Sequence, residues 1–190
     1  MPFPRTWVEE LIIEWLHLDG FLVEANLPVG VPEHPKGGGG RLEVDVVGAR
    51  INNNTLEIRH IETSAEIPKT EEKIEEKIEE KIKKKFSDKI RKAVTSYFKQ
   101  RFLFTGGEPD YQKIFIPTYG GSFRILEHSN IIIKPLHEFI CQDILPTIQK
   151  WKQNPPHQPR CPGKHITLPE SHWLLQLIDC LNSRGLLKGC

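Results

Sequence analysis

Two carboxylates on neighbouring segments are the first candidates for chemistry in this chain. Asp45 lies within an alternating apolar segment, 41–50, and Glu62 lies near the end of a second one, 55–63. A short Asn-rich turn joins the segments, so pairing as a β-hairpin would bring the carboxylates close together. Adjacent carboxylates repel unless a divalent cation lies between them, and such a cation can polarise a phosphodiester and activate water. The pair therefore predicts a metal site, with two solvent-facing acids at the strand ends as the alternative.

Side chains alternate between the two faces of a strand, so the hairpin should present one polar face and one core face. Beside the acids we expect Arg41, Glu43, Val47, His60 and Ser64. Of these, Arg41 and His60 could contact phosphate. The opposite face should hold core residues, namely Val44, Val46, Ile61 and Thr63.

A helix predicted over 5–19 precedes the hairpin. Thr6 is a good N-cap, Glu9 three residues later completes a capping box, and Gly20 is a natural stop. Apolar residues recur at helical spacing between these ends. The helix could supply a third carboxylate to a metal, from Glu9, Glu10 or Glu14.

A long helical segment, 69–102, should follow the hairpin as one helix or two abutting ones. Its apolar row recurs every four residues and rotates by about 40° per step on an α-helix. Only the part from Phe86 to Phe98 is therefore expected to pack on the core. Eight basic residues and one acid lie between Lys83 and Arg101, an excess that could meet phosphates or face solvent.

The remaining elements complete an α/β order with a mixed sheet. Strands are expected over 21–29, 111–119 and 130–135, and helices over 135–153 and 170–187. Pro146 lies inside the first of these helices and could kink it.

The order of these elements, with an acid in the first strand of the hairpin and a Glu at the end of the second, resembles the PD-(D/E)XK, or restriction-endonuclease-like, nuclease superfamily. The resemblance covers roughly residues 5–135. It implies a three-layer α/β fold, in which a mixed central sheet is flanked by helices. Residues 1–135 would form the core, and 136–190 a C-terminal helical extension packed on the same domain.

The resemblance also implies roles for individual residues. Asp45 and Glu62 would bind Mg²⁺ or Mn²⁺, and by position Glu10 would assist. The superfamily lysine falls at Ser64, so a cation from Lys69, Lys73 or Arg41 would stand in for it. DNA contacts would come from Arg41, His60, Lys89, Arg91 and Lys92.

The function implied is that of a metal-dependent DNA endonuclease or phosphodiesterase, with DNA as partner and a homodimer acting on two strands. A catalytically inactive member of the same fold, serving as a nucleic-acid-binding or assembly module, is the alternative, and the loss of the lysine supports it. A protein-interaction module built on the long helix is a third interpretation.

Composition sets further bounds on these interpretations. The net charge is +1, and no apolar run approaches the roughly 18–20 residues of a membrane span. The first residues do not form a signal-peptide pattern. Four cysteines without a CxxC pair favour free thiols and the cytoplasm. The spacing of His157, Cys161, His165 and His172 does not match a zinc site.

Overall fold

The computed structural model describes residues 6–29, 42–64, 84–118, 130–155, 167–187 and 189–190. Residues 30–41, which include four consecutive glycines, and residues 65–83, which include the lysine-rich EEKI repeat, lie outside these ranges. The first part of the helix predicted over 69–102 is therefore not among the described residues. The same holds for several single residues considered above, namely Arg41, Lys69, Lys73, His157, Cys161 and His165.

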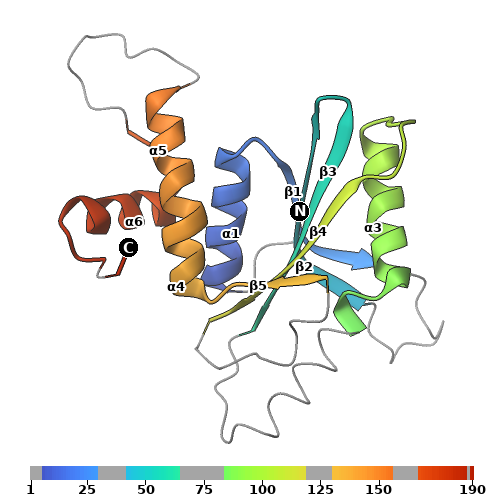
Figure 1. Cartoon of the computed structure of the whole chain (residues 1–190), viewed down its shortest axis with the longest axis horizontal. Helices are drawn as coiled ribbons and strands as arrows, with labels where there is room; N and C mark the ends of the chain where they lie inside the picture. Colours follow the sequence, from blue (N-terminus) through green and yellow to red (C-terminus); the bar gives the residue numbers. More distant parts are fainter. Residues whose placement is uncertain (1–5, 30–41, 65–83, 119–129, 156–166, 188) are drawn as a thin grey trace, which may run out of the picture.

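The described residues form a five-stranded sheet, in the order β1 (Leu22–Val29), β2 (Leu42–Asn52), β3 (Thr55–Ser64), β4 (Asp110–Pro117) and β5 (Ile131–Ile133). β1, β2 and β3 pair antiparallel, whereas β3, β4 and β5 pair parallel. The prediction of an α/β chain with a mixed sheet is therefore confirmed (Figure 1).

Helices cover both faces of this sheet (Figure 1). One side carries α1 (Trp7–Leu18), α4 (Leu136–Phe139), α5 (Leu145–Gln153) and α6 (Trp173–Ser183), and the other carries α3 (Asp88–Arg101). Among the described residues, no helix is long and apolar enough to cross a membrane.

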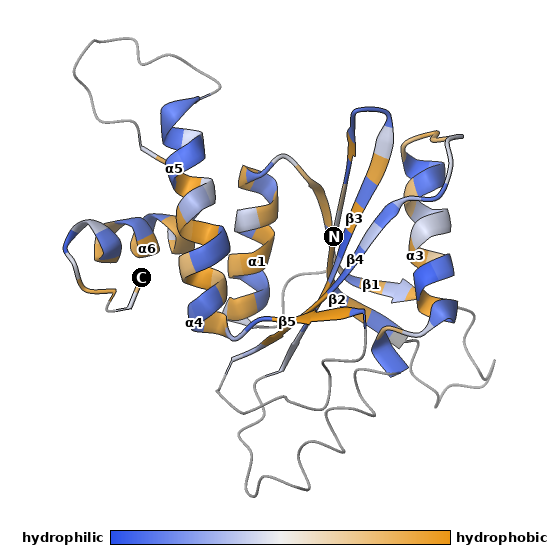
Figure 2. Cartoon of the chain, viewed as in Figure 1, coloured by the Kyte–Doolittle hydropathy of each residue, from blue (hydrophilic) through white to orange (hydrophobic). Residues whose placement is uncertain are grey.

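Two apolar clusters correspond to these two sides. The first joins α1 and α4–α6 to the sheet and includes Leu11, Ile61, Ile148 and Leu175. The second joins α3 to the sheet and includes Ile58, Val94 and Phe98. In Figure 2 the apolar surfaces of α1 and α5 accordingly meet between the helices.

The start of α1 and the hairpin turn follow from local sequence. The Thr6 hydroxyl accepts the Glu9 N–H at 3.2 Å and caps α1 as predicted. Asn53 and Asn54 both have positive φ, 47° and 63°, as a two-residue type I′ turn requires. At Gly48 of β2, a Cβ atom would meet the Leu16 side chain at 3.0 Å, so glycine lets α1 approach the sheet closely.

The predicted faces of β2 are correct for Val46 but wrong for Val44. Val46 packs in the cluster under α1, whereas Val44 packs with Val47 in the cluster under α3. The change of side occurs at Asp45, which lies opposite Asn26 of β1, where φ is +50°. β1 changes side at the same level, since Val23 packs under α1 and Leu27 under α3, on either side of Asn26. Nothing in the apolar pattern of β2 signals this change.

The second half of the long helical segment is a separate helix. Ser87 is extended at φ −62° and ψ 154°, and α3 begins at Asp88, after the helical residues 84–85. Phe86, Ile90, Val94 and Phe98 are all buried, which confirms the predicted core row.

The helix predicted over 135–153 is regular except for one π-helical turn, Ile140–Ile144, between α4 and α5. Pro146 follows this turn and has no N–H for an α-helical bond, so the extra residue of the turn accommodates it. The Thr147 hydroxyl donates to the Asp143 carbonyl at 2.7 Å and accepts the Trp15 indole N–H at 3.0 Å. The distorted turn is thereby fastened to α1.

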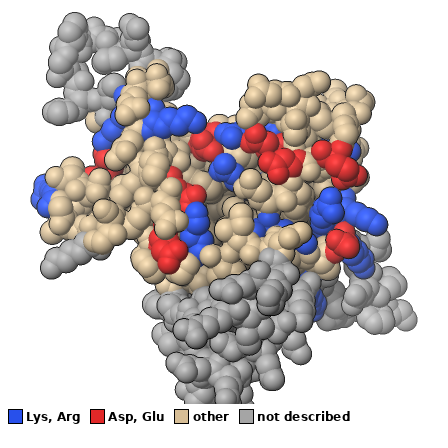
Figure 3. Space-filling model, in the orientation of Figure 1, with Lys and Arg blue, Asp and Glu red and all other residues tan. Residues whose placement is uncertain are grey.

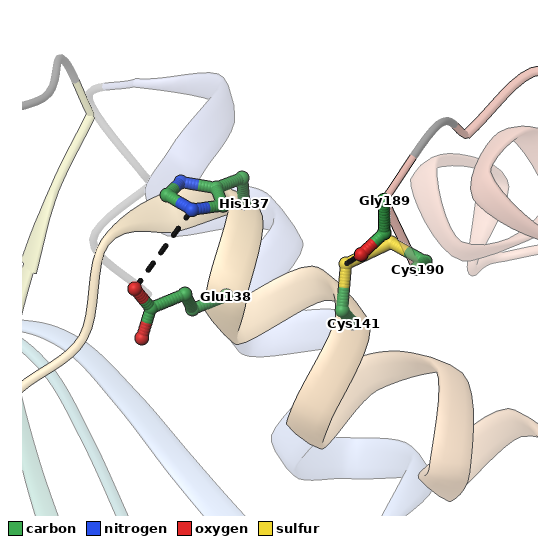
Figure 4. The surroundings of a disulfide bond; sticks show 5 residues. All are labelled: His137, Glu138, Cys141, Gly189 and Cys190. Atoms are coloured by element: carbon green, nitrogen blue, oxygen red, sulfur yellow. Dashed lines mark hydrogen bonds and ion pairs between the residues drawn. A yellow bond between two sulfur atoms is a disulfide. The ribbon is translucent and has the colours of Figure 1, made fainter.

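The prediction of free thiols is wrong for two of the cysteines. Cys141, in the π-helical turn, forms a disulfide with Cys190, which lies beyond α6 (Figure 4). Cys180 is free and exposed. The prediction of a cytoplasmic location rests on all four cysteines being free thiols, and this reason does not hold for the Cys141–Cys190 pair.

Opening this disulfide should destabilise the fold, because the bond closes a segment with a sequence separation of 49. We expect Cys141→Ser to lower the free energy of unfolding by about 2–4 kcal/mol. Chemical denaturation with and without reductant measures the change. Cys180→Ser is the matched control and should retain the sensitivity to reductant, which Cys141→Ser should lose. Equal melting of oxidised and reduced wild type would contradict the expectation.

Candidate metal site

The predicted acid pair lies where β2 and β3 cease to pair regularly. The last paired residues are Val46 and Ile61, and the acids are the next residue on each strand. Beyond them, side chains replace the ladder: the Asp45 carboxylate accepts the Thr63 N–H at 3.0 Å, and the Asp45 N–H points at Glu62 Oε1 at 3.4 Å. The structure thus brings the two predicted acids together.

A lysine from another element completes this group. Lys85, in the helical turn before α3, places its ammonium 3.1 Å from Asp45 Oδ1 and 2.7 Å from Glu62 Oε2. Its third donor reaches the Glu43 carbonyl at 2.6 Å. One cation therefore joins β2, β3 and the start of the α3 segment.

Charge and burial give the three groups different proton affinities. Burial, and then the charge of Asp45, raise the pKa of Glu62 to about 8. Burial acts on Asp45 in the same direction, but Lys85 and the Thr63 N–H prevail and lower its pKa. Burial alone would lower the pKa of Lys85, yet the two carboxylates raise it, so this lysine stays charged.

Glu62 is also held from its other side. His60 is fully buried, and its Nε2 lies 2.9 Å from Glu62 Oε1. Its Nδ1 lies 2.8 Å from the Tyr111 hydroxyl of β4. Burial, and then Lys85, lower the pKa of His60 to about 3, so the ring is neutral. Burial likewise raises the pKa of Tyr111, which keeps its proton.

The oxygen atoms around the Lys85 ammonium form a donor set that fits a hard divalent cation. Two carboxylate oxygens and one backbone carbonyl oxygen each lie 2.6–3.1 Å from the Lys85 nitrogen. Mg²⁺ is usually bound by one or two carboxylates plus water and phosphate oxygens, which this set allows. Within the described ranges, no three or more His, Cys, Asp and Glu residues are grouped so that they could hold a metal ion, and the set around Lys85 has two, Asp45 and Glu62.

Of the three candidate carboxylates of α1, Glu14 is engaged away from the pair. Glu14 is buried and accepts the Leu174 and Leu175 N–H groups at 3.2 and 2.9 Å, which caps the start of α6. Glu10 lies on the same helix, close enough to Glu14 and His17 to influence their pKa values. In the described part of the chain no hydrogen bond or ion pair joins Glu10 to Asp45 or Glu62, so its metal role stays a prediction.

Ser64 lies in the position predicted for the missing lysine. It is buried at the end of β3, and its carbonyl accepts a hydrogen bond from the N–H of Thr118, the residue after β4. His60 is fully buried with both ring nitrogens engaged, so the prediction that it contacts phosphate does not fit.

Of the residues predicted to contact DNA, Lys89, Arg91 and Lys92 lie on α3. Lys89 and Lys92 are exposed, whereas Arg91 is paired with Glu108 at 3.4 Å. Basic and acidic side chains are intermixed on the face seen in Figure 3. DNA binding by α3 stays a prediction.

Sequence reasoning missed Lys85 and Tyr111. Lys85 is one of three consecutive lysines at the end of a repeat rich in lysine, and the repeat itself does not distinguish it. A usable signal was the pair Ser87–Asp88, a typical helix start that would have placed Lys85 in a turn beside a core phenylalanine. Tyr111 carried no signal, since its partner His60 is on another strand.

Comparison with known proteins adds no assignment. No protein-family model matches the chain, and neither the curated proteins nor the solved structures contain a match.

The two carboxylates of α1 can be separated by experiment. Glu14→Ala removes the acceptor for two buried N–H groups and should lower the free energy of unfolding by about 1–3 kcal/mol. It should leave Mn²⁺ affinity, measured by calorimetry, unchanged. Glu10→Ala is the matched control on the same helix and should leave stability nearly unchanged. Loss of Mn²⁺ binding by folded Glu14→Ala protein would show that this carboxylate belongs to the metal site.

Proposed function

We propose that this protein is a metal-dependent DNA endonuclease or phosphodiesterase of the restriction-endonuclease-like type. The observation that carries the proposal is the convergence of Asp45, Glu62 and Lys85 where β2 and β3 separate. An acid pair with an adjacent cation suits phosphodiester hydrolysis, since the acids can bind a metal and the cation can stabilise developing negative charge.

Each residue of the group has a distinct role in this proposal. Asp45 and Glu62 hold Mg²⁺ or Mn²⁺, which when bound polarises the phosphodiester and lowers the pKa of water. Lys85 leaves the carboxylates to the metal and keeps its ammonium beside them, where it orients the attacking water and stabilises the phosphate. It thereby takes the part that the resemblance assigns to a lysine at Ser64.

The proposed substrate is DNA, approached over the exposed lysines of α3. Lys89 and Lys92 lie in the first two turns of α3, so phosphates bound there would lie on the side of the sheet that carries the acids. A homodimer, which would present two sites to two strands, and a cytoplasmic location belong to the same proposal.

The first test is cleavage of plasmid and oligonucleotide DNA with Mg²⁺ or Mn²⁺. Asp45→Ala and Glu62→Ala should each reduce the rate by more than about 100-fold, because each removes a metal ligand. Thermal melting should show that both variants are folded. Wild type that does not cleave DNA with either metal would overturn the proposal.

The second test separates the metal ligands from Lys85. Lys85→Met removes the ammonium that competes for the carboxylate oxygens, so Mn²⁺ should bind as tightly as in wild type or more tightly. Cleavage should nevertheless fall by about 100-fold or more, because a charge needed in the transition state is gone.

The matched control is Lys84→Met, which removes an exposed lysine one residue away. It should keep both metal affinity and cleavage. A Lys85→Met variant with full cleavage would contradict the role assigned to this lysine.

The alternative is an inactive nuclease fold that serves as a nucleic-acid-binding or assembly module. The same ion pairs favour it, because an ammonium that permanently joins the two carboxylates would be a structural link between three elements. The two functions differ in metal binding. A module of this kind would bind DNA equally with and without Mg²⁺, and Asp45→Ala would leave that binding unchanged.

A further inference from the structure

We propose that His60 and Tyr111 are positioning residues for the metal site. Tyr111 selects the ring tautomer of His60, and His60 holds one oxygen of Glu62 so that the other faces the cation position. This inference rests on the proposed metal role of Glu62 and assigns a function to two residues that do not themselves reach the cation.

The geometry is a chain of three groups on two neighbouring strands. The Tyr111 hydroxyl of β4 is 2.8 Å from His60 Nδ1, and His60 Nε2 is 2.9 Å from Glu62 Oε1 on β3. The second oxygen, Oε2, is the one that contacts the Lys85 ammonium, at 2.7 Å. The two oxygens of Glu62 therefore have separate partners. Oε1 faces His60 in the protein interior, and Oε2 faces the Lys85 ammonium, the position proposed for the metal.

The surroundings fix this chain in place. Glu62 is 2% exposed and His60 is not exposed at all, so water does not compete for their hydrogen bonds. The Phe86 ring packs on the His60 ring with centroids 4.6 Å apart. Since Phe86 directly follows Lys85, the ring contact that holds the imidazole also holds the backbone that carries the Lys85 side chain.

The hydrogen-bond inventory then sets the direction of each proton. A carboxylate that binds a metal is ionised and can only accept hydrogen bonds, so His60 must donate through Nε2. In the neutral ring Nδ1 is then an acceptor, and the Tyr111 hydroxyl is the donor that faces it. Without the Tyr111 hydroxyl only the carboxylate would favour this tautomer, and the opposite tautomer would turn a lone pair toward the carboxylate.

Residues that hydrogen-bond to a metal ligand, as His60 does to Glu62, typically change metal affinity by 10–100-fold when they are removed. We therefore expect the loss of the His60 donor to weaken Mn²⁺ binding by about this factor while the fold is retained. The effect on cleavage should be reversed in part by a raised Mn²⁺ concentration, because the ligand itself remains.

The main experiment compares two substitutions at His60. His60→Gln keeps an N–H donor near the Nε2 position, whereas His60→Leu fills a similar volume without a donor. Calorimetric titration with Mn²⁺ should give near wild-type affinity for His60→Gln and a loss of about 10–100-fold for His60→Leu. Equal affinities in two folded variants would overturn the proposal, because packing alone would then explain the histidine.

The second experiment tests the tyrosine. Tyr111→Phe removes only the hydroxyl and should weaken Mn²⁺ binding in the same direction. Its control is Tyr97→Phe, since the Tyr97 hydroxyl donates to Glu24 at 2.8 Å on α3 and β1, away from His60. An equal loss of Mn²⁺ affinity in both variants, or no loss in Tyr111→Phe, would count against the proposed role of the Tyr111 hydroxyl.

A spectroscopic readout keeps this inference separate from the nuclease proposal. Nitrogen NMR at about pH 9, with and without Mg²⁺, should show His60 protonated at Nε2 in wild type and a tautomer mixture in Tyr111→Phe. An Nδ1-protonated ring in wild type would overturn the inference whether or not DNA is cleaved. Absent cleavage with the expected tautomer and Mn²⁺ affinities would overturn only the nuclease activity.

Discussion

The contact between the Lys85 ammonium and the carboxylates of Asp45 and Glu62 is the interaction on which the site depends. Two acids meet there at a place where β2 and β3 no longer share backbone hydrogen bonds, so repulsion between them would separate the strands further. The ammonium contacts both acid groups and also fastens the start of the α3 segment to the Glu43 carbonyl. The position of a helix and the charge of the site are therefore coupled.

The elements that local chemistry determines were predictable from sequence, and those that tertiary contacts determine were not. Thr6 predicts a helix start and the Asn-rich turn predicts a hairpin, because both structures depend on a few adjacent residues. The acid pair follows from the hairpin. The cation beside it does not, because several lysines of the segment are equivalent until Phe86 packs on His60 and selects Lys85. The disulfide likewise joins residues that no short-range pattern relates.

Burial of a carboxylate does not by itself mark it as part of the site. Glu14 is about as buried as Glu62, but it accepts two N–H groups at the start of α6 and binds the C-terminal helices to α1. Glu62 accepts from a lysine and a histidine whose positions depend on different elements. The difference lies in the partners: backbone donors satisfy Glu14 permanently, whereas one partner of Glu62 is a side chain that can move.

The exposure of the groups around Glu62 bears on whether Lys85 is a permanent link or a placeholder for a metal. The Lys85 side chain is 18% exposed and that of Asp45 21%, while that of Glu62 is 2% exposed. The ammonium thus reaches the acids from the solvent side on a flexible four-carbon stem. In the proposed function the ammonium withdraws along this path, and His60 and Tyr111 keep Glu62 in place. The proposed exchange of the ammonium for a metal requires this combination, a partly exposed cation beside a buried carboxylate.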